Sequence, residues 1–141
     1  MPVIDVLTRV ARAVESIVPD LALQPYIGAD TFLEGDSGSP EDGEWSRYLG
    51  FDMTYRGHEL GRFEHASAGS ESDQLCSVVQ ELLSQVQDVV CEATTEPWPQ
   101  VMTNGRKDMA LGDAAVVGDE LQMWYGDRDA PALRIPRVSL E

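Results

Sequence analysis

Residues 72–93 have the sequence SDQLCSVVQELLSQVQDVVCEA, which is the strongest periodic signal in the chain. The apolar residues recur at three- and four-residue steps, the spacing of one face of an α-helix. They occupy a stripe of about 80–140°, the width expected of a helix that faces a core. Ser70 or Ser72 can cap the start, and Pro97 and Pro99 end the helix. The stripe consists of Leu75, Val79, Leu82, Leu83, Val86, Val89 and Val90.

A second amphipathic helix is predicted over residues 3–18. Pro2 suits a helix start and Pro19 would stop the helix, because proline lacks the N–H that an interior position needs. The apolar positions of this helix are Val3, Val6, Leu7, Val10, Val14 and Ile17.

Residues 48–66 alternate between apolar and polar side chains, which predicts a β-hairpin with its turn at residues 56–59. Leu60 and Phe63 on the return strand fall on opposite parities. Gly61 lies between them and is the expected position of a β-bulge.

Residues 114–117, 121–125 and 132–138 are predicted to be three short strands of an antiparallel meander. Pro136 cannot donate a ladder hydrogen bond, so its strand should lie at a sheet edge. The aromatic residues Trp45, Tyr48, Trp124 and Tyr125 are expected in the core or at its edge.

The remaining stretches are interrupted by glycine and proline. Residues 19–47 are predicted to be largely irregular, with a short strand around 26–33, and residues 34–44 to be a mobile acidic loop. We predict a loop over 100–112 that contains a turn at 104–105, the Asn-Gly pair.

Together these elements predict a single α+β domain over residues 1–141. The order helix, hairpin, helix, meander favours two helices packed on one face of a five-stranded antiparallel sheet, a two-layer fold. Residues 139–141 are expected to form a disordered or vector-derived tail.

The chain has 141 residues, 25 acidic against 10 basic, a net charge of -15 and a pI near 4.3. This charge opposes direct binding to nucleic acid. No apolar run reaches the roughly 18 residues of a membrane span, and no charged segment precedes an apolar stretch as in a secretory signal. Nine of the ten basic residues are arginine, which suggests a GC-rich bacterial genome.

The two cysteines, Cys76 and Cys91, both fall on the predicted helix 72–93. At a rise of about 1.5 Å per residue they are about 22 Å apart along its axis, too far for a disulfide. Free thiols fit a cytoplasmic protein.

Three motifs resemble catalytic or metal sites and are incomplete. Residues 35–40, GDSGSP, resemble the nucleophile loop of chymotrypsin-like proteases, but no histidine precedes Ser37. Residues 58–62 resemble the zinc motif H-E-x-x-H, with Arg62 in place of the second histidine. The acids after residue 30 do not follow the ligand spacing of a calcium loop. We therefore predict no catalytic residue, metal or cofactor, although scattered residues can form a site that one sequence does not reveal.

Two features point to a protein partner. Trp98 lies between two prolines that fix the direction of the chain, so it either anchors a partner or covers the end of the core. The predicted acidic loop supplies the other candidate contacts, Glu34, Asp36, Glu41, Asp42 and Glu44.

The expected function is a non-catalytic, protein-binding accessory or chaperone-like module without a membrane or nucleic-acid partner. The order of an N-terminal helix, strands, a central helix and further strands resembles that of the type III secretion chaperones. Those chaperones usually end in another helix, which this chain lacks. The alternative is an acidic inhibitor of a basic enzyme, such as an immunity protein, an antitoxin or a nucleic-acid mimic. A homodimer remains open.

Overall fold

A computed structural model describes residues 3–29, 47–67 and 70–141, which form two helices and eight strands. The elements follow one another as α1 (Val3–Glu15), β1 (Leu21–Ala29), β2 (Arg47–Tyr55), β3 (His58–Ser67), α2 (Glu71–Thr94), β4 (Gln100–Thr103), β5 (Arg106–Met109), β6 (Gly112–Val117), β7 (Glu120–Gly126) and β8 (Pro131–Ser139).

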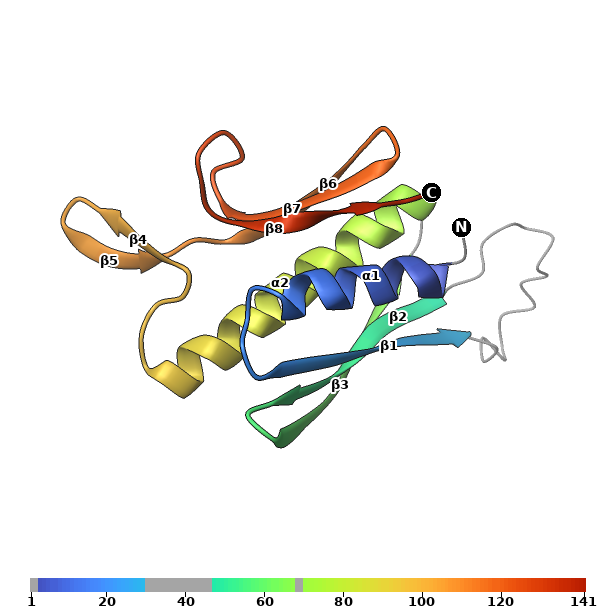
Figure 1. Ribbon diagram of the computed structural model, residues 1–141, viewed down its shortest axis with the longest axis horizontal. Coiled ribbons are helices and arrows are strands. Elements are labelled where there is room, and N and C mark those ends of the chain that lie inside the picture. Colours follow the sequence, from blue (N-terminus) through green and yellow to red (C-terminus); the bar gives the residue numbers. More distant parts are fainter. Residues whose placement is uncertain (1–2, 30–46, 68–69) are drawn as a thin grey trace.

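The strands form three separate antiparallel sheets, with the orders β1-β2-β3, β4-β5 and β6-β7-β8. The two helices lie between the first and the third sheet (Figure 1). Helix α1 packs against β1 and β8, and α2 packs against β6, β2 and β3. The α+β class is confirmed, but the predicted five-stranded sheet in a two-layer fold is wrong.

The width of the apolar helix surfaces explains this difference. At about 100° per residue, the buried side chains of α2 cover roughly half of its circumference. A helix with so wide a buried surface can contact a sheet on each side, whereas one sheet covers only a narrower stripe. The buried residues of α2 are Leu75, Val78, Val79, Leu82, Leu83, Val86, Gln87 and Val90.

One continuous core joins the three layers. Phe51 of β2 and Tyr125 of β7 are fully buried and belong to the inner faces of the two outer sheets. Tyr125 donates a hydrogen bond from its hydroxyl to the Leu83 carbonyl oxygen, at 2.6 Å. Both outer sheets therefore depend on the same helix pair for the burial of their apolar faces.

The predicted helix over 72–93 is confirmed as α2. Ser70 is its cap, and the Ser70 hydroxyl accepts a hydrogen bond from the Asp73 backbone N–H at 3.1 Å. Helix α1 ends at Glu15, earlier than predicted, although Val18 beyond it is buried. Cys76 and Cys91 both lie on α2 as free cysteines.

The strand predicted around 26–33 corresponds in part to β1, which begins earlier, at Leu21, and is described as far as Ala29. Residues 30–33 lie outside the described residues. Leu21, Leu23 and Pro25 alternate with exposed residues and face the core. Pro25 can occupy this strand because β1 lies at the edge of its sheet.

The predicted hairpin is confirmed as β2–β3, but its turn has only two residues, Arg56 and Gly57, with φ of 51° and 79°. The sequential positive φ values are those of a tight hairpin turn. The bulge is also confirmed, because Gly61 pairs with Met53 while Glu59 pairs with Thr54. Gly61 has a φ of 95°, which favours glycine there.

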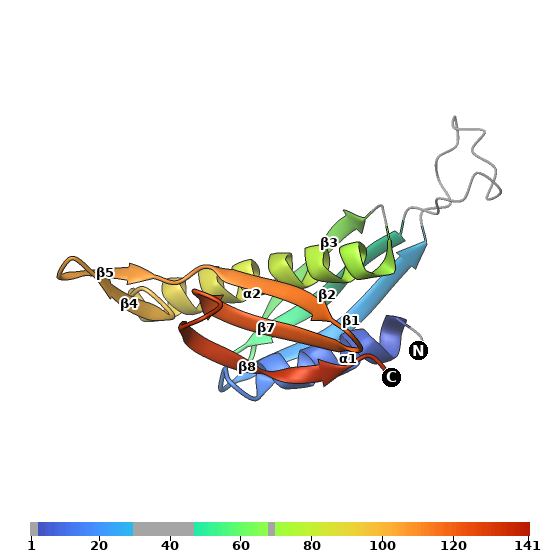
Figure 2. The ribbon, with the colours of Figure 1, turned by 90° about the horizontal axis from the view of Figure 1, so that it is seen from above.

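The loop predicted over 100–112 is wrong, since this segment contains the hairpin β4–β5. Its predicted turn is confirmed, with φ of 52° at Asn104 and 75° at Gly105. The hairpin projects from one end of the molecule beyond α2 (Figure 2). Nearly all of its residues are exposed, so it lacks the alternation of buried and exposed residues that marks a strand in a sequence.

The predicted meander is confirmed as β6–β8, and Pro136 lies in the edge strand β8. Among the aromatic residues expected in the core, Tyr125 belongs to it, and Trp124 is buried on the other face of β7. Tyr48 is half-buried on the outer face of its sheet. Trp45 lies outside the described residues.

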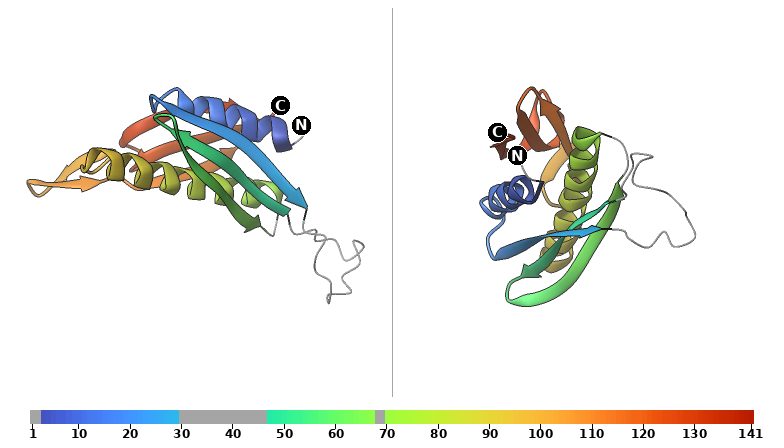
Figure 3. Two further views of the ribbon diagram at one scale, coloured as in Figure 1. Left: turned by 90° about the horizontal axis from the view of Figure 1, so that it is seen from below. Right: turned by 90° about the vertical axis from the view of Figure 1, so that its right-hand side faces the viewer.

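The two ends of the described chain lie near each other (Figure 3). Arg9 of α1 donates hydrogen bonds to the carbonyl oxygens of Ser139 and Glu141, at 3.0 and 3.1 Å. The backbone N–H of Leu140 donates to the Asp119 carbonyl oxygen at 2.8 Å. In the described ranges, neither helix combines the length and the apolar character that a membrane crossing needs.

Candidate protein-binding surface

The β4–β5 hairpin and the residues after it expose apolar side chains at one end of the molecule. We call residues 100–111 the arm. Met102 is 64% exposed, Met109 is 42% exposed and Leu111 is 71% exposed. An apolar surface that protrudes in this way is typical of a protein contact.

The register places two of these side chains on one face of the arm. Met102 pairs with Lys107, and Gln100 pairs with Met109. Because side chains alternate along a strand, these four residues share a face, and Val101 lies on the other. Val101 is half-buried and packs against the core. The arm therefore rests on the protein only near its base.

The base of the arm is held at three points. The backbone N–H of Ala110 donates to the Pro99 carbonyl oxygen at 2.9 Å. The buried side chain of Gln87 in α2 donates to the Ala110 carbonyl oxygen. The backbone N–H of Gly126 donates to the Leu111 carbonyl oxygen at 2.8 Å. The hairpin therefore projects from a fixed root.

Trp98 lies beside this root. Its ring meets Tyr125 edge to face, with centroids 5.2 Å apart and an interplanar angle of 67°. Its backbone N–H donates to the Cys91 Sγ atom at 3.2 Å. The side chain is half-buried against the core, so only its outer part is available to a partner.

The other five predicted contact residues lie outside the described part of the chain. Glu34, Asp36, Glu41, Asp42 and Glu44 fall within residues 30–46.

The tip of the arm carries positive charge. Arg106 and Lys107 follow the turn, and both are exposed. Asp108 accepts a hydrogen bond from the Met109 backbone N–H at 2.9 Å. A basic tip on a chain of net charge -15 would favour a partner surface that includes carboxylates.

The outer face of the β1–β3 sheet carries an ion pair, Arg62 with Asp52, beside the ring of Tyr26. Arg62 donates from Nε and Nη2 to the two Asp52 carboxylate oxygens, at 2.7 and 3.1 Å. The guanidinium lies 3.8 Å from the centroid of the Tyr26 ring. The hydrogen bond from Arg62 lowers the pKa of Asp52 below its ordinary value. These groups satisfy one another within the sheet.

Histidine, cysteine and acidic side chains are the candidates for metal binding or nucleophilic chemistry in the described ranges. No group of three histidine, cysteine or acidic residues in these ranges could hold a metal ion. His58 and Glu59, predicted in a turn, are exposed at the start of β3. Burial raises the pKa of the Cys76 thiol, which disfavours the reactive thiolate.

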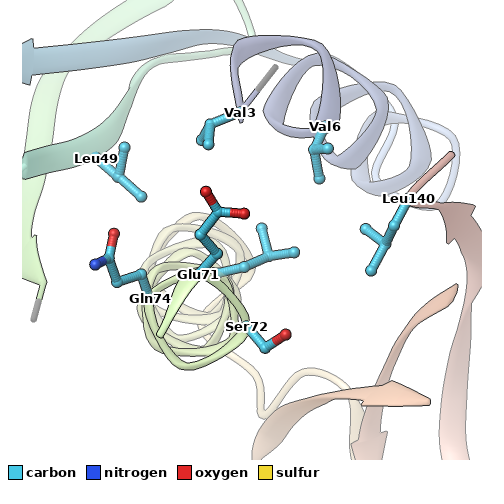
Figure 4. A pocket seen from close by; sticks show the side chains of 8 residues that line it. Val3, Val6, Leu49, Glu71, Ser72, Gln74 and Leu140 are labelled. Atoms are coloured by element: carbon cyan, nitrogen blue, oxygen red, sulfur yellow. The ribbon is translucent and has the colours of Figure 1, made fainter. Parts of the chain in front are cut away.

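A small pocket lies at the opposite end of α2 from the arm, where the start of α2 meets α1 and Leu140 (Figure 4). Its volume is about 140 Å³. Val3, Val6 and Leu140 supply apolar walls, and Glu71 and Gln74 supply polar groups. This space is small for a ligand site, since such pockets are usually about 300 Å³ or larger.

Comparison with known proteins adds no assignment, because no protein-family model, curated protein or solved structure matches the chain. The sequence predictions missed the three apolar residues of the arm. The signal that could have found them was the Asn-Gly turn at residues 104–105, flanked on each side by a few residues without glycine or proline.

Proposed function

We propose that this protein is a non-catalytic accessory module, similar in role to a chaperone, that binds another protein through the arm. The observation that carries the proposal is the exposure of Met102, Met109 and Leu111 on a hairpin whose root is fixed. A two-stranded hairpin is at best marginally stable by itself in water. A partner that covered the apolar face would stabilise the arm and bury these side chains.

The chemistry of the arm defines the kind of partner. Methionine and leucine side chains fit an apolar surface, and methionine adapts its shape to uneven contacts. Arg106 and Lys107 at the tip would pair with carboxylates beside that surface. Among the described strands, β4 and β5 pair only with each other, so an extended segment of the partner could add to either edge as a further strand.

The proposal is tested by affinity capture from the source organism with a matched pair of variants. The arm variant is M102S/M109S/L111S, and the control is L60S/V117S, which changes exposed apolar residues elsewhere. We expect one protein to bind the wild type and the control at low and at high salt and to be lost from the arm variant. The captured protein is then purified, and its affinity for each variant is measured by calorimetry. Equal affinity for all three would refute docking through the arm.

The net charge of -15 favours a second candidate, the acidic inhibitor of a basic enzyme. Salt screens exposed charges, so such a complex should weaken steeply as the salt concentration rises. It should also be indifferent to the arm substitutions. The same capture experiment therefore separates the two functions.

A further inference from the structure

A second surface feature lies on the β6–β8 sheet, whose β7–β8 turn begins at Gly126, next to the root of the arm. It is a pocket of about 320 Å³ formed by β7, β8 and the turn between them. This volume falls at the lower end of the range for small-molecule sites, about 300–1,000 Å³. The polar residues that line it are Gln122, Trp124, Arg128, Asp129, Arg134 and Arg137.

The charge of this pocket is opposite to that of the whole chain. Three of the nine arginines line it, together with one acidic residue, Asp129. The chain as a whole has 25 acidic and 10 basic residues. A guanidinium offers a planar fork of N–H donors that fits the oxygens of a phosphate or a carboxylate. The pocket therefore has the chemistry of an anion site.

Trp124 forms the floor of this arrangement. It alternates along β7 with the core residues Met123 and Tyr125, so its side chain lies on the outer face of the sheet. It is nevertheless only 6% exposed. The Arg128 guanidinium lies 5.3 Å from the centroid of its ring, and Arg134 is its direct cross-strand neighbour. The Arg128 cation is thus held over the Trp124 ring, and Arg134 lines the same pocket from the neighbouring strand.

The indole N–H of Trp124 is an additional donor. Among the described residues, none accepts a hydrogen bond from this N–H. A buried tryptophan usually donates its N–H to a partner. An anion in this pocket could accept that hydrogen bond.

Two irregularities of the sheet create the pocket. The register of β8 shifts between the pairs Met123–Ile135 and Leu121–Val138. Two residues, Pro136 and Arg137, therefore lie between the inward-facing Ile135 and Val138, and both are exposed. In a regular strand Arg137 would face the core, whereas this bulge turns it to the face of Arg134.

Gly126 is the second irregularity. Its φ is 100°, and a Cβ atom would lie 2.9 Å from the Ala132 backbone nitrogen. Only glycine tolerates this combination without strain. The turn that starts here brings Arg128 back over Trp124.

The arginines of the pocket are available to a ligand. Arg137 contacts Glu120 at 3.5 Å, and the side chains are 64% and 41% exposed, so this pair is weak and readily exchanged. Arg128 and Arg134 form no salt bridge among the described residues. Arg62, in contrast, is fully engaged by Asp52.

We propose that this pocket binds the phosphate group of a small phosphorylated molecule. A phosphate dianion matches three guanidinium groups better than a single carboxylate does, because it carries more charge and more acceptor oxygens. The net negative charge of the chain does not prevent binding, since interactions beyond about 8 Å are largely screened at physiological ionic strength. The proposal is independent of docking through the arm.

The test is a titration of the full chain with inorganic pyrophosphate at constant ionic strength, followed by the indole N–H resonances in ¹⁵N NMR spectra. The chain has three tryptophans, and Trp124→Phe assigns the resonance of interest. We expect the Trp124 resonance to shift with a saturable dependence, while that of Trp98, which packs on Tyr125, stays unchanged. Arg134→Gln should weaken binding by about tenfold or more, the loss expected of one charge-assisted pair.

The matched control is Arg56→Gln. Arg56 also lies over an aromatic ring, at 5.1 Å from the Tyr55 centroid, but on the other outer sheet. We expect this variant to bind pyrophosphate like the wild type. Equal weakening by both substitutions would show general charge attraction and overturn the proposal. Equally tight binding of acetate would overturn the phosphate class, and the absence of a saturable shift would overturn the site.

Discussion

At the scale of single residues, Tyr125 connects the β6–β8 sheet to α2 through one buried hydrogen bond to Leu83. We predict that Tyr125→Phe lowers the free energy of unfolding by about 1 kcal/mol, the usual net value of such a bond. The loss is moderate because the Leu83 carbonyl oxygen lies within α2 and keeps its helical partner. Urea denaturation of both proteins measures the difference, and a change above about 3 kcal/mol would indicate a packing defect instead.

The same hydroxyl makes stability depend on alkaline pH. Burial raises the pKa of Tyr125 far above its ordinary value. Its stabilising contribution is complete below about pH 10, the pKa of tyrosine in an unfolded chain, and is lost as the pH rises further, because only the unfolded state then ionises. We expect the free energy of unfolding to fall above that pH in the wild type and to fall less in Tyr125→Phe. Identical pH profiles would contradict this prediction.

At Gly50 the backbones of β2 and β3 lie too close together to leave room for a side chain. A Cβ atom at this position would lie 1.9 Å from the Phe63 carbonyl oxygen. We predict that Gly50→Ala forces the two strands apart and destabilises the protein by more than about 3 kcal/mol. Gly57→Ala is the control, because its φ is 79° and a Cβ atom there meets nothing within 4 Å. It should cost about 1 kcal/mol from backbone strain alone, and thermal unfolding of both variants provides the comparison.

At the scale of elements, the arm and strand β7 represent two extremes of burial. All of β5 is exposed, whereas Leu121, Met123 and Tyr125 of β7 are buried in the core. Amide hydrogen exchange should therefore be fast in β4 and β5 and slow in β7, because few buried contacts oppose local opening of the arm. Addition of the captured partner should slow exchange in the arm. Slow exchange in the free protein would show that the arm is stable without a partner.

Sequence periodicity predicted the elements whose buried residues repeat at a regular spacing. Helix α2 and the β2–β3 hairpin were found because their buried residues repeat at helical or alternate spacing. Strand β1 begins earlier than the sequence predicts, because Pro25 resembles a break. The position of a strand at a sheet edge, which allows this proline, is a tertiary property. The division into separate sheets depends on how much of the α2 surface is covered by strands. The spacing of apolar residues in the sequence of α2 does not reveal this.

The candidate sites were harder to predict than the fold. Trp98 was found from its flanking prolines, and the structure places it beside the root of the arm. The exposed residues of the arm follow no period because, of its two strands, the described core contacts chiefly Val101. The arginine pocket was missed because a bulge reverses the direction of Arg137. If side chains alternated strictly along β8, Arg134 and Arg137 would lie on opposite faces of the sheet.

At the scale of the whole molecule, the charge balance should control stability. The chain carries 25 acidic and 10 basic residues. The described part contains three salt bridges, each with at least one side chain that is 43% exposed or more. Such exposed salt bridges contribute little to the free energy of unfolding. In the folded state, repulsion among the unpaired carboxylates should therefore exceed the attraction within the salt bridges. Added salt weakens both the repulsion and the attraction. The larger of the two determines whether salt raises or lowers stability.

We therefore predict that the unfolding temperature rises by several degrees when KCl is increased from about 0.02 M to about 0.3 M, a range over which the screening length shortens to less than about 10 Å. Differential scanning calorimetry measures the shift. Sucrose at matched osmolality serves as the control, since it alters hydration without screening charge. A fall in the unfolding temperature with KCl would mean that the salt bridges outweigh the repulsion. The rise with KCl should be smaller in the protein–partner complex if the basic tip of the arm pairs with carboxylates, because KCl also weakens that contact.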